Sequence, residues 1–445
     1  MGRRRRGNRI PQEPVEVVIE SLSHEGKGVA HHNDKVMFVS GALAGERVLA
    51  KYIKVQRRHD EAMVHEVLEA SSDRIDPQCK QFGVCGGCSL QHLSSENQIA
   101  VKQTALIDTL KHVGKVEPDS ILPALMNDSP WGYRRKARLG VKYVTKKDKV
   151  LVGFRERGTS FITDTEVCHV LHPSVGLLIT LLSSLIYNLS IKDKIPQIEV
   201  AIDDHQCILV FRILEDLTQD DKDSLLSFGK EHNVIIYTQS GGPATIKPLM
   251  GEPVVLSYEL PEYSVNNQFL PTDFTQVNTD INKKMISLAM KLLDVQSTDK
   301  VLDLFCGLGN FTLPIATKAA EVIGVEGDQD LVSRAKENAL SNNINNTRYF
   351  LTDLYESVDQ QIWNGETFDK VLLDPPRSGA FEIVKMIDKF NASRIVYVSC
   401  YPATLARDLD VLVNEKGYKL ESAGVMDMFP HTSHVESIAL LTKNI

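Results

Sequence analysis

The residues of this sequence that could do chemistry follow apolar segments, and Cys400 is the first of them. It comes directly after the β-branched run Ile395–Val398, and Pro402 blocks any continuation of a strand. A thiol in that position lies at the carboxyl end of a buried strand, where open α/β sheets bind their ligands. Two interpretations are open. Cys400 is a nucleophile, or it is a buried free cysteine that behaves as a small hydrophobe.

A glycine-rich turn and an acidic residue mark a second candidate site upstream. Gly307 and Gly309 separate an apolar segment from a helical one, so the backbone there can approach a ligand closely. Glu326 ends the next apolar segment, where a carboxylate can accept both hydroxyls of a ribose. The dinucleotide pattern Gly-x-Gly-x-x-Gly is absent and no basic residue stands ready for a phosphate, which favours S-adenosylmethionine over NAD.

Two further carboxylates could act together with Cys400. Asp374 is followed by two prolines that fix a rigid carboxylate at a strand end, although an ordinary turn is the alternative. Glu436 falls near Cys400 if the last two strands lie beside the cysteine's strand; otherwise it is a solvated surface carboxylate. A thiol with a carboxylate suits methylation of a pyrimidine at C5. The thiol adds to C6, C5 takes a methyl group, and the carboxylate removes the C5 proton.

Four of the seven cysteines suggest a metal centre. Cys79, Cys85 and Cys88 all lie in one glycine-rich segment of ten residues, and Cys168 lies far downstream. Four thiolates suit tetrahedral zinc or an iron–sulfur cluster, and the spacing leaves both open. The spacing is not the Cys-x3-Cys-x2-Cys of radical chemistry, so a structural or redox-sensing centre is expected.

Composition indicates a multidomain, cytoplasmic protein. The chain has 445 residues, of which 42% are apolar and 24% charged, and no run of about 18 apolar residues could span a membrane. The net charge of -8 argues against a uniformly basic nucleic-acid binder. Basic residues cluster locally, in an arm at Arg3–Arg6 with Arg9 and again around Arg134–Lys136. Such clusters are either solvated faces or nucleic-acid contacts.

Residues 13–71, after a basic arm at 1–12, predict a small all-β module. Strands are expected at Val15–Ile19, Lys35–Val39 and Glu46–Ala50, with glycines between them. Five-stranded barrels of the oligonucleotide-binding kind have this pattern, and exposed basic residues would then contact RNA. A purely structural barrel is the alternative.

Residues 72–262 predict a central antiparallel α+β domain. Helices are expected at Gln91–Val113, which could pack on the following domain, and at Val175–Leu189. The expected strands are Lys136–Tyr143, Val150–Glu156, Glu199–Ile202, Ile208–Ile213 and Val234–Tyr237.

Residues 263–445 alternate between strand and helix patterns, which predicts a doubly wound parallel sheet. The expected strands are Lys300–Leu304, Glu321–Val325, Lys370–Asp374 and Arg394–Val398, with helices near 278–293, 310–318, 329–342 and 382–390. Two more strands within Tyr418–Leu441 would form an antiparallel edge. The whole chain therefore reads as a multidomain protein that combines all-β, α+β and α/β parts.

Taken together, these motifs closely resemble the RNA uracil-C5 methyltransferases that combine a TRAM domain with a class I methyltransferase domain. The resemblance covers nearly the whole chain and is closest to the members that act on 23S rRNA. It implies S-adenosylmethionine as methyl donor and a [4Fe-4S] cluster on Cys79, Cys85, Cys88 and Cys168. It assigns the nucleophile to Cys400 and the base to Glu436. It places the cofactor on Gln276, Phe305, Asn310, Glu326, Asp353 and Asp374.

The resemblance therefore implies an enzyme that methylates C5 of a uridine in 23S rRNA, as a monomer without a protein partner. The chain departs from the family at Tyr401, where asparagine is usual, and at Asp353, where a carboxamide is often found. Three rivals are the same chemistry on another RNA or on a second rRNA position, an RNA-binding protein with a structural metal and a lapsed methyltransferase fold, and a dehydrogenase. Intact Cys400, Glu436 and Glu326 argue against the second, and the missing dinucleotide pattern argues against the third.

Overall fold

The computed structural model describes residues 10–356 and 362–443, so the basic arm at Arg3–Arg6 and Arg9 lies outside the described residues. The chain forms two compact units. The first contains the residues up to Ala105 together with Arg155–Phe161 and Phe429–His434, and the second contains Leu106–Phe154, Ile162–Met428 and the residues from Val435. Within the described part of the chain, no helix has the length and apolar character that crossing a membrane requires.

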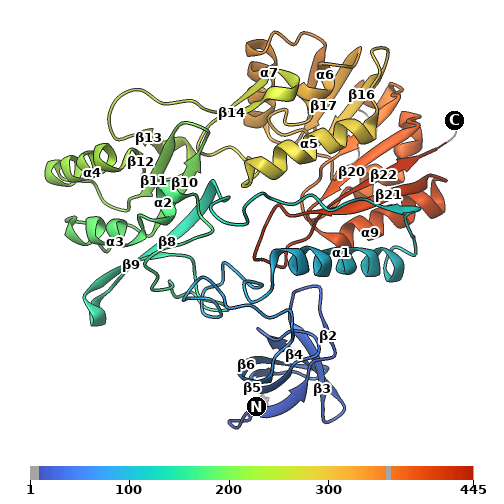
Figure 1. Ribbon diagram of the computed structural model, residues 1–445. Helices are drawn as coiled ribbons and strands as arrows, with labels where there is room; N and C mark the ends of the chain where they lie inside the picture. The colour runs from blue at the N-terminus through green and yellow to red at the C-terminus, as the bar shows by residue number, and fades with distance from the viewer. Residues whose placement is uncertain (1–9, 357–361, 444–445) are drawn as a thin grey trace, which may run out of the picture. The chain divides into compact units, whose positions relative to one another are not determined.

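The first unit contains one six-stranded sheet, in the order β1-β5-β6-β4-β3-β2 (Figure 1). Its strands are β1 (Val15–Val18), β2 (Ser21–Leu22), β3 (Gly28–His32), β4 (Lys35–Ser40), β5 (Arg47–Val55) and β6 (His59–Glu69). The three predicted strands are present as β1, β4 and β5, but five strands was an undercount by one, because β2 has only two residues. Alternate side chains of these strands build a small core that includes Val17, Met37 and Val48.

The second unit contains a central six-stranded sheet in the order β13-β12-β11-β10-β8-β9. Its strands are β8 (Lys136–Val144), β9 (Lys149–Gly153), β10 (Gln197–Ile202), β11 (Cys207–Arg212), β12 (Ile235–Gln239) and β13 (Ile246–Pro248). The prediction of an antiparallel domain was wrong at one pair, since β11 and β12 run parallel. Helix α4 (Gln219–His232) connects β11 to β12, and a helical crossover of this kind lets two neighbouring strands run in the same direction.

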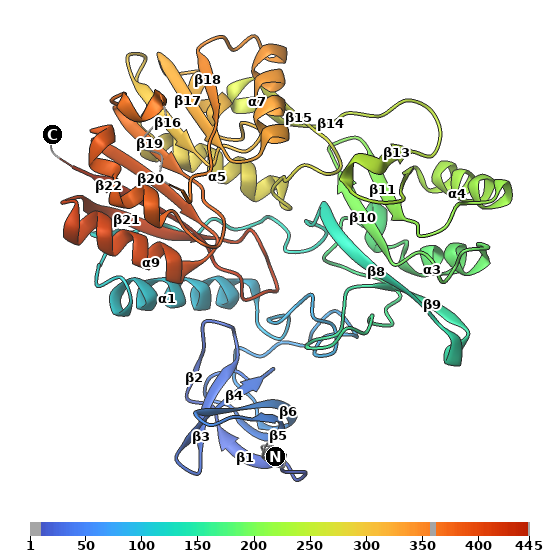
Figure 2. The same cartoon turned by 180° about the vertical axis from the view of Figure 1, so that it is seen from behind.

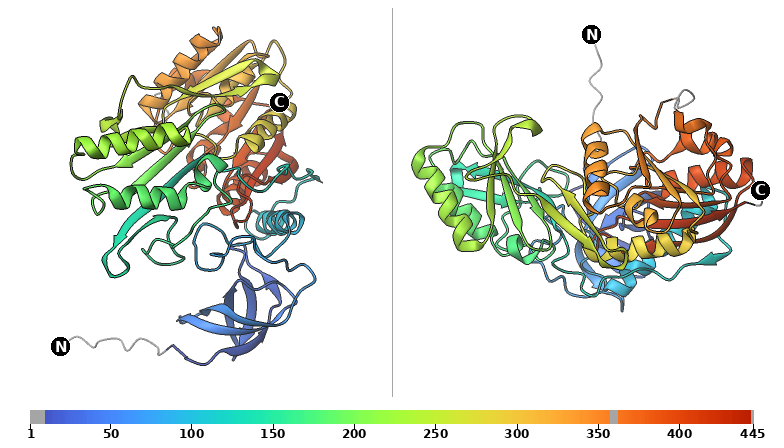
Figure 3. Two further views of the ribbon diagram at one scale, coloured as in Figure 1. Left: turned by 60° about the vertical axis from the view of Figure 1, so that its left-hand side comes forward. Right: turned by 90° about the horizontal axis from the view of Figure 1, so that it is seen from above.

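Three helices fall where one or none was expected. The predicted helix over Val175–Leu189 is two helices, α2 (Pro173–Gly176) and α3 (Ile179–Asn188). The helix predicted over Gln91–Val113 is present as α1 (Ser95–His112) and is not one of the three. Helix α4 had not been predicted. Figures 1 and 3 show α3 and α4 side by side on one face of the central sheet, where Leu182 and Leu225 enter its core.

The second unit also contains an eight-stranded sheet, seen from behind in Figure 2, in the order β18-β17-β16-β19-β20-β22-β21-β7. Its strands are β7 (Ser120–Ile121), β16 (Lys300–Leu304), β17 (Glu321–Glu326), β18 (Thr347–Leu351), β19 (Lys370–Leu373), β20 (Arg394–Ser399), β21 (Lys419–Met426) and β22 (Glu436–Thr442). The five strands from β18 to β20 are parallel, and β22 then runs antiparallel to both β20 and β21. The doubly wound sheet with an antiparallel pair is confirmed; β18 and β7 had not been predicted.

The helices of this fold cover buried, uniformly apolar strands. They are α5 (Thr279–Leu293), α6 (Thr312–Ala316), α7 (Gln329–Ser341), α8 (Phe381–Lys385) and α9 (Pro402–Asp410). Strand β20 is apolar on both faces, and Ile395, Val396 and Val398 have no exposed surface. Strands of this kind need helices on both sides. An antiparallel hairpin of β14 (Leu256–Leu260) and β15 (Val265–Phe269) precedes α5 and forms its own two-stranded sheet.

Candidate active site

The glycine-rich loop leaves β16 in a left-handed turn. Phe305, Gly307 and Gly309 all have positive φ, at 65°, 56° and 100°. Only glycine adopts this region at little cost, so the loop needs both glycines to turn tightly. The amide of Phe305 donates to the carbonyl of Val325 at 2.9 Å, which ties the loop to the end of β17.

Glu326 stands at the end of β17, where its carboxylate accepts three backbone hydrogen bonds. The amide of Gly307 donates to Oε2 at 2.9 Å, and the amides of Gly327 and Asp328 donate to Oε1 at 2.8 and 3.1 Å. These bonds fix the carboxylate beside the glycine-rich loop. The carboxylate has about four lone-pair sites and three are used, so Oε2 of Glu326 can still accept one hydroxyl of a ribose.

The buried Asp303 lies within electrostatic reach of Glu326 and of the half-buried Asp374. Burial raises the pKa of Asp374, at the end of β19, to about 7. Burial also raises the pKa of Asp303, in β16, to about 8, and the charges of Asp374 and Glu326 act in the same direction. Thr312 donates to Asp303 Oδ2 at 2.5 Å, whereas Asp303 Oδ1 is buried and has no hydrogen-bond partner among the described residues. Crowded acids of this kind suit a cationic ligand, such as a sulfonium, because a positive charge would offset their mutual repulsion.

Asp303 is a site residue that the sequence reasoning missed. The sequence signal was a lone carboxylate inside the apolar run Val301–Leu304, and such a buried charge is rare without a role or a partner.

The remaining predicted cofactor residues form two groups. The Phe305 ring lies 5.9 Å from the Tyr355 ring, and the exposed Asp353 accepts a hydrogen bond from the Tyr355 amide at 2.9 Å. Asn310 instead bonds to side chains beside a cavity that Gln276 lines. Phe305 and Asp353 therefore lie beside Tyr355, whereas Asn310 and Gln276 lie at the cavity.

Cys400 and Glu436 are neighbours at the end of the strand pair β20–β22. The antiparallel register pairs Val398 with Ile438 and Ser399 with Ser437, so the next position on each strand is Cys400 opposite Glu436. Glu436 is 3% exposed and Cys400 is half-buried. Pro402 begins α9 two residues later, which turns the chain away and leaves the thiol at the strand end.

The thiol of Cys400 is protonated at neutral pH. Burial, and after it the charges of Glu436 and Asp374, raise its pKa to about 11, while Arg377 acts in the opposite direction. Glu436, Asp374 and Arg377 therefore all lie close enough to Cys400 to affect the charge on its sulfur. The predicted partners of Cys400 are thus within electrostatic reach of it.

Alkylation of Cys400 should therefore depend steeply on pH. Because only the thiolate reacts, its rate with iodoacetamide should rise about tenfold per pH unit between pH 7 and 9. Mass spectrometry of the Cys400 peptide measures that rate. Cys207 is the internal control, since it is 4% exposed and burial raises its pKa to about 12, so it should stay unmodified. A rate for Cys400 that is already level at pH 8 would contradict the raised pKa.

The cysteines predicted to hold a metal divide between the two units. Cys79, Cys85 and Cys88 belong to the first and Cys168 to the second, where it packs against the core of the central sheet. Among the residues that the structure describes, no three or more Cys, His, Asp or Glu side chains converge in the manner of metal ligands.

Two of these cysteines lie beside a cationic side chain, and one of them accepts a backbone hydrogen bond. Burial lowers the pKa of the Arg157 guanidinium, and the Cys85 and Cys88 thiols beside it act in the opposite direction. The amide of Gly87 donates to Cys85 Sγ at 3.4 Å. Cysteine sulfurs are the usual ligands of zinc and of iron–sulfur clusters, so the chemistry of this donor set fits a metal or cluster.

Comparison with known proteins gives two domain matches. Residues 258–444 match the family model described as tRNA (Uracil-5-)-methyltransferase, and residues 12–62 match the TRAM domain.

The chain is also similar over its full length to curated proteins named 23S rRNA (uracil(1939)-C(5))-methyltransferase RlmD. It is 52% identical to that of Alkalilimnicola ehrlichii, covering 100% of this chain and 99% of the relative. It is 51% identical to that of Nitrosococcus oceani, covering 97% and 96%.

Among solved structures, the Pyrococcus abyssi tRNA (uracil-54, C5)-methyltransferase in complex with S-adenosyl-L-homocysteine matches with a TM-score of 0.74. The match covers 96% of this chain and 100% of the other at 23% identity, and supports the fold.

Proposed function

Because the chain belongs to the family of the 23S rRNA (uracil(1939)-C(5))-methyltransferases RlmD, we propose that it methylates C5 of a uridine in 23S rRNA with S-adenosylmethionine as donor. The predicted family is thereby confirmed. The observation that carries the proposed chemistry is the pair Cys400 and Glu436, side by side at the end of β20 and β22 with Asp374 in reach.

Covalent addition would make the uracil C5 nucleophilic. The Cys400 thiolate adds to C6, forming a carbon–sulfur bond and an enolate across C4 and C5. The donor supplies an electrophilic methyl group when bound, and C5 takes it. Glu436 then removes the proton from C5, the carbon–sulfur bond breaks, and the thiolate leaves with the product base restored.

The thiol must first lose its proton, and the site contains groups that act in both directions. Glu436 and Asp374 oppose ionisation, whereas the positive charge of Arg377 favours it. A cationic methyl donor beside Asp374 and Asp303 would add a second positive charge. We therefore expect the thiolate to form chiefly in the loaded site, which protects the free enzyme from unwanted alkylation.

The donor site in this proposal lies around Glu326, Asp303 and Asp374, with Phe305 and Asp353 to one side and Gln276 and Asn310 to the other. The orphaned Asp303 Oδ1 and the fixed carboxylate of Glu326 support this assignment. A cationic sulfonium suits the unpartnered oxygen of Asp303, and a ribose hydroxyl suits the remaining acceptor site of Glu326.

RNA binding is assigned to the TRAM domain and to residues 72–262. In the TRAM domain, four basic residues of β5 and the following turn are all exposed, as expected of a phosphate-binding face: Lys51, Lys54, Arg57 and Arg58.

The function is tested by incubating the protein with labelled S-adenosylmethionine and either 23S rRNA or tRNA, and by analysing the nucleosides. We expect 5-methyluridine in 23S rRNA alone. Methylation of tRNA instead would assign the same chemistry to another substrate, and no transfer to either would contradict the proposal.

We also propose that Cys79, Cys85, Cys88 and Cys168 hold a [4Fe-4S] cluster, as the family resemblance implies. Bound there, it would supply a covalent cross-link between the segments that carry the four thiols. Protein purified without oxygen should absorb in the visible range and contain about four iron and four sulfide ions per chain. Colourless protein with one zinc ion per chain would contradict the cluster.

A further inference from the structure

The carboxamide of Asn310, at the end of the glycine-rich loop, is held by two neighbouring side chains. Tyr258 in β14 donates from its hydroxyl to Asn310 Oδ1 at 2.7 Å. Asn282 in α5 forms a reciprocal amide pair with Asn310, in which each Nδ2 donates to the other's Oδ1 at 3.0 Å. Asn310 thus faces neighbours 52 and 28 residues away in the sequence.

Both neighbours are themselves buried and well defined. Tyr258 is 7% exposed and Asn282 is 3% exposed. Burial raises the pKa of Tyr258 far above the working pH, so its hydroxyl keeps the proton that it donates. A buried amide pair with a third partner has little freedom to rotate, because each alternative orientation would leave a polar atom unpaired.

The hairpin that carries Tyr258 is attached to the glycine-rich loop at a second point. Asn338 in α7 donates to the carbonyls of Leu308 and Gln268 at 3.1 and 3.0 Å, and accepts from the Gln268 amide at 2.9 Å. The hairpin, α7 and the loop therefore form one hydrogen-bonded assembly around Asn310.

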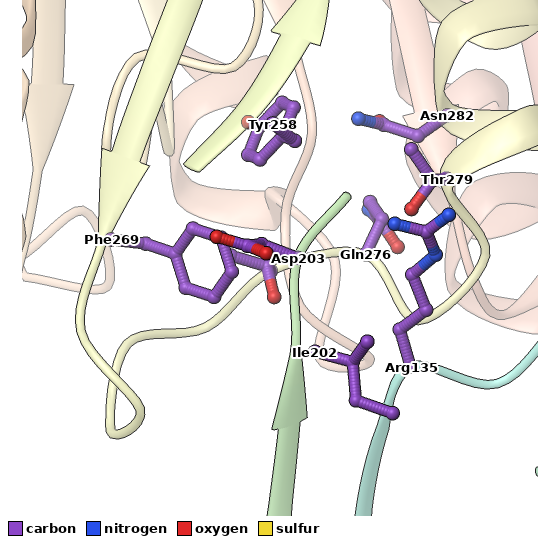
Figure 4. Close-up of a pocket in the computed structure, with 9 residues that line it drawn as sticks. Arg135, Ile202, Asp203, Tyr258, Phe269, Gln276, Thr279 and Asn282 are labelled. Atoms are coloured by element: carbon purple, nitrogen blue, oxygen red, sulfur yellow. The ribbon is translucent and has the colours of Figure 1, made fainter. Parts of the chain in front are cut away.

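Tyr258 and Asn282 also line the cavity that contains Gln276. Figure 4 shows the two side chains and Gln276 turned toward the same space, with Arg135 and Asp203 from the central domain at its border. Arg135 is ion-paired with Asp204, and Asp203 accepts backbone amides, so both charges are held in place. Fixed side chains of opposite charge beside amide groups suit a zwitterion. The amino-acid end of S-adenosylmethionine is such a group, whereas Glu326 suits the ribose end.

We propose that Tyr258 and Asn282 are positioning residues that aim the Asn310 carboxamide at the amino-acid end of the methyl donor. Asn282 Oδ1 takes one of the two Nδ2 hydrogens of Asn310, and among the described residues the second is left for a carboxylate of the ligand. This inference rests on the proposed function, since it needs the donor to bind at this loop.

Calorimetric titration tests it with two ligands. Tyr258→Phe should weaken S-adenosylmethionine about five- to tenfold, the scale of one lost hydrogen bond. It should leave binding of 5′-methylthioadenosine, which lacks the amino-acid end, within about twofold. Tyr263→Phe is the matched control, because Tyr263 is a buried tyrosine in the turn of the same hairpin and, among the described residues, its hydroxyl makes no hydrogen bond to Asn310; both ligands should bind this variant normally.

Equal weakening of both ligands, or unchanged binding of both, would overturn the positioning role. Glu326→Ala separates this failure from failure of the proposed function. If wild-type protein binds the donor and Glu326→Ala does not, the donor site stands whatever Tyr258→Phe does. If Glu326→Ala binds as tightly as wild type, the donor site itself is wrong and the inference falls with it.

Discussion

Replacing Cys400 by alanine should abolish methylation of 23S rRNA while leaving binding of S-adenosylmethionine within about twofold. The expected loss of rate is about 10⁴-fold or more, the scale seen when a covalent nucleophile is removed. The reason is chemical, since C5 of uracil does not attack a methyl group until a thiolate has added at C6. Transfer of labelled methyl groups measures the first effect, and calorimetric titration measures the second.

Cys207→Ala is the matched control for this prediction. Cys207 is a buried thiol in β11 of the central sheet, so the variant also loses one sulfur but leaves the site intact. Its methylation rate should stay within about threefold of wild type, allowing for the small stability cost of a core truncation. Full turnover by Cys400→Ala would exclude the covalent route.

Glu436→Gln should stop the reaction after methyl transfer and trap the enzyme on its RNA. Glutamine has the same shape but accepts no proton, so the C5 proton stays and the carbon–sulfur bond to Cys400 cannot break. We expect a band on denaturing gels with the combined mass of protein and RNA, formed only when the donor is present. Overall turnover should fall at least about 10²-fold, as for loss of a general base.

Two controls bear on this adduct. The double variant Cys400→Ala with Glu436→Gln should form none, because the bond needs the thiol. Glu421→Gln removes a carboxylate from the neighbouring strand β21, where Glu421 bonds to Thr442 and Lys419, and should turn over normally. If Glu436→Gln releases product at the normal rate without an adduct, another group removes the proton.

Much of the catalytic domain could be predicted from the sequence, because its strands are short apolar runs that end in polar residues. Such runs identified β16, β17, β19 and β20, and with them the strand-end positions of Glu326, Asp374 and Cys400. A parallel strand that is buried on both faces is a continuous apolar run. It can therefore be recognised from its own sequence, without knowledge of the strands that it pairs with.

Elements with weaker signatures were missed. Helix α4 has few apolar residues, although the capping box of Thr218 and Asp221 marks its start in the sequence. Strand β7 has two residues, too few for any pattern. The parallel pairing of β11 and β12 depended on α4, so that error followed from the first.

Contacts between distant residues could not be predicted from local patterns. Nothing in the segment around Tyr258 shows that its hydroxyl bonds to Asn310, since only the folded hairpin brings them together. The same holds for the unpartnered oxygen of Asp303. The position of Glu436 could be stated only conditionally, because it depends on which strand β22 joins.

That strand order has a consequence for how the enzyme is made. Strand β22 is synthesised after β20 and β21 yet lies between them, so neither earlier strand can take its final neighbour until the last one arrives. The pairing of β20 with β22 skips α9 and β21, and such non-local pairings form more slowly than local ones. The proton acceptor reaches the thiol in the same step that completes the sheet. In the proposed mechanism, we therefore expect that a chain in which β22 has not yet joined the sheet has Cys400 without Glu436 and cannot release its RNA.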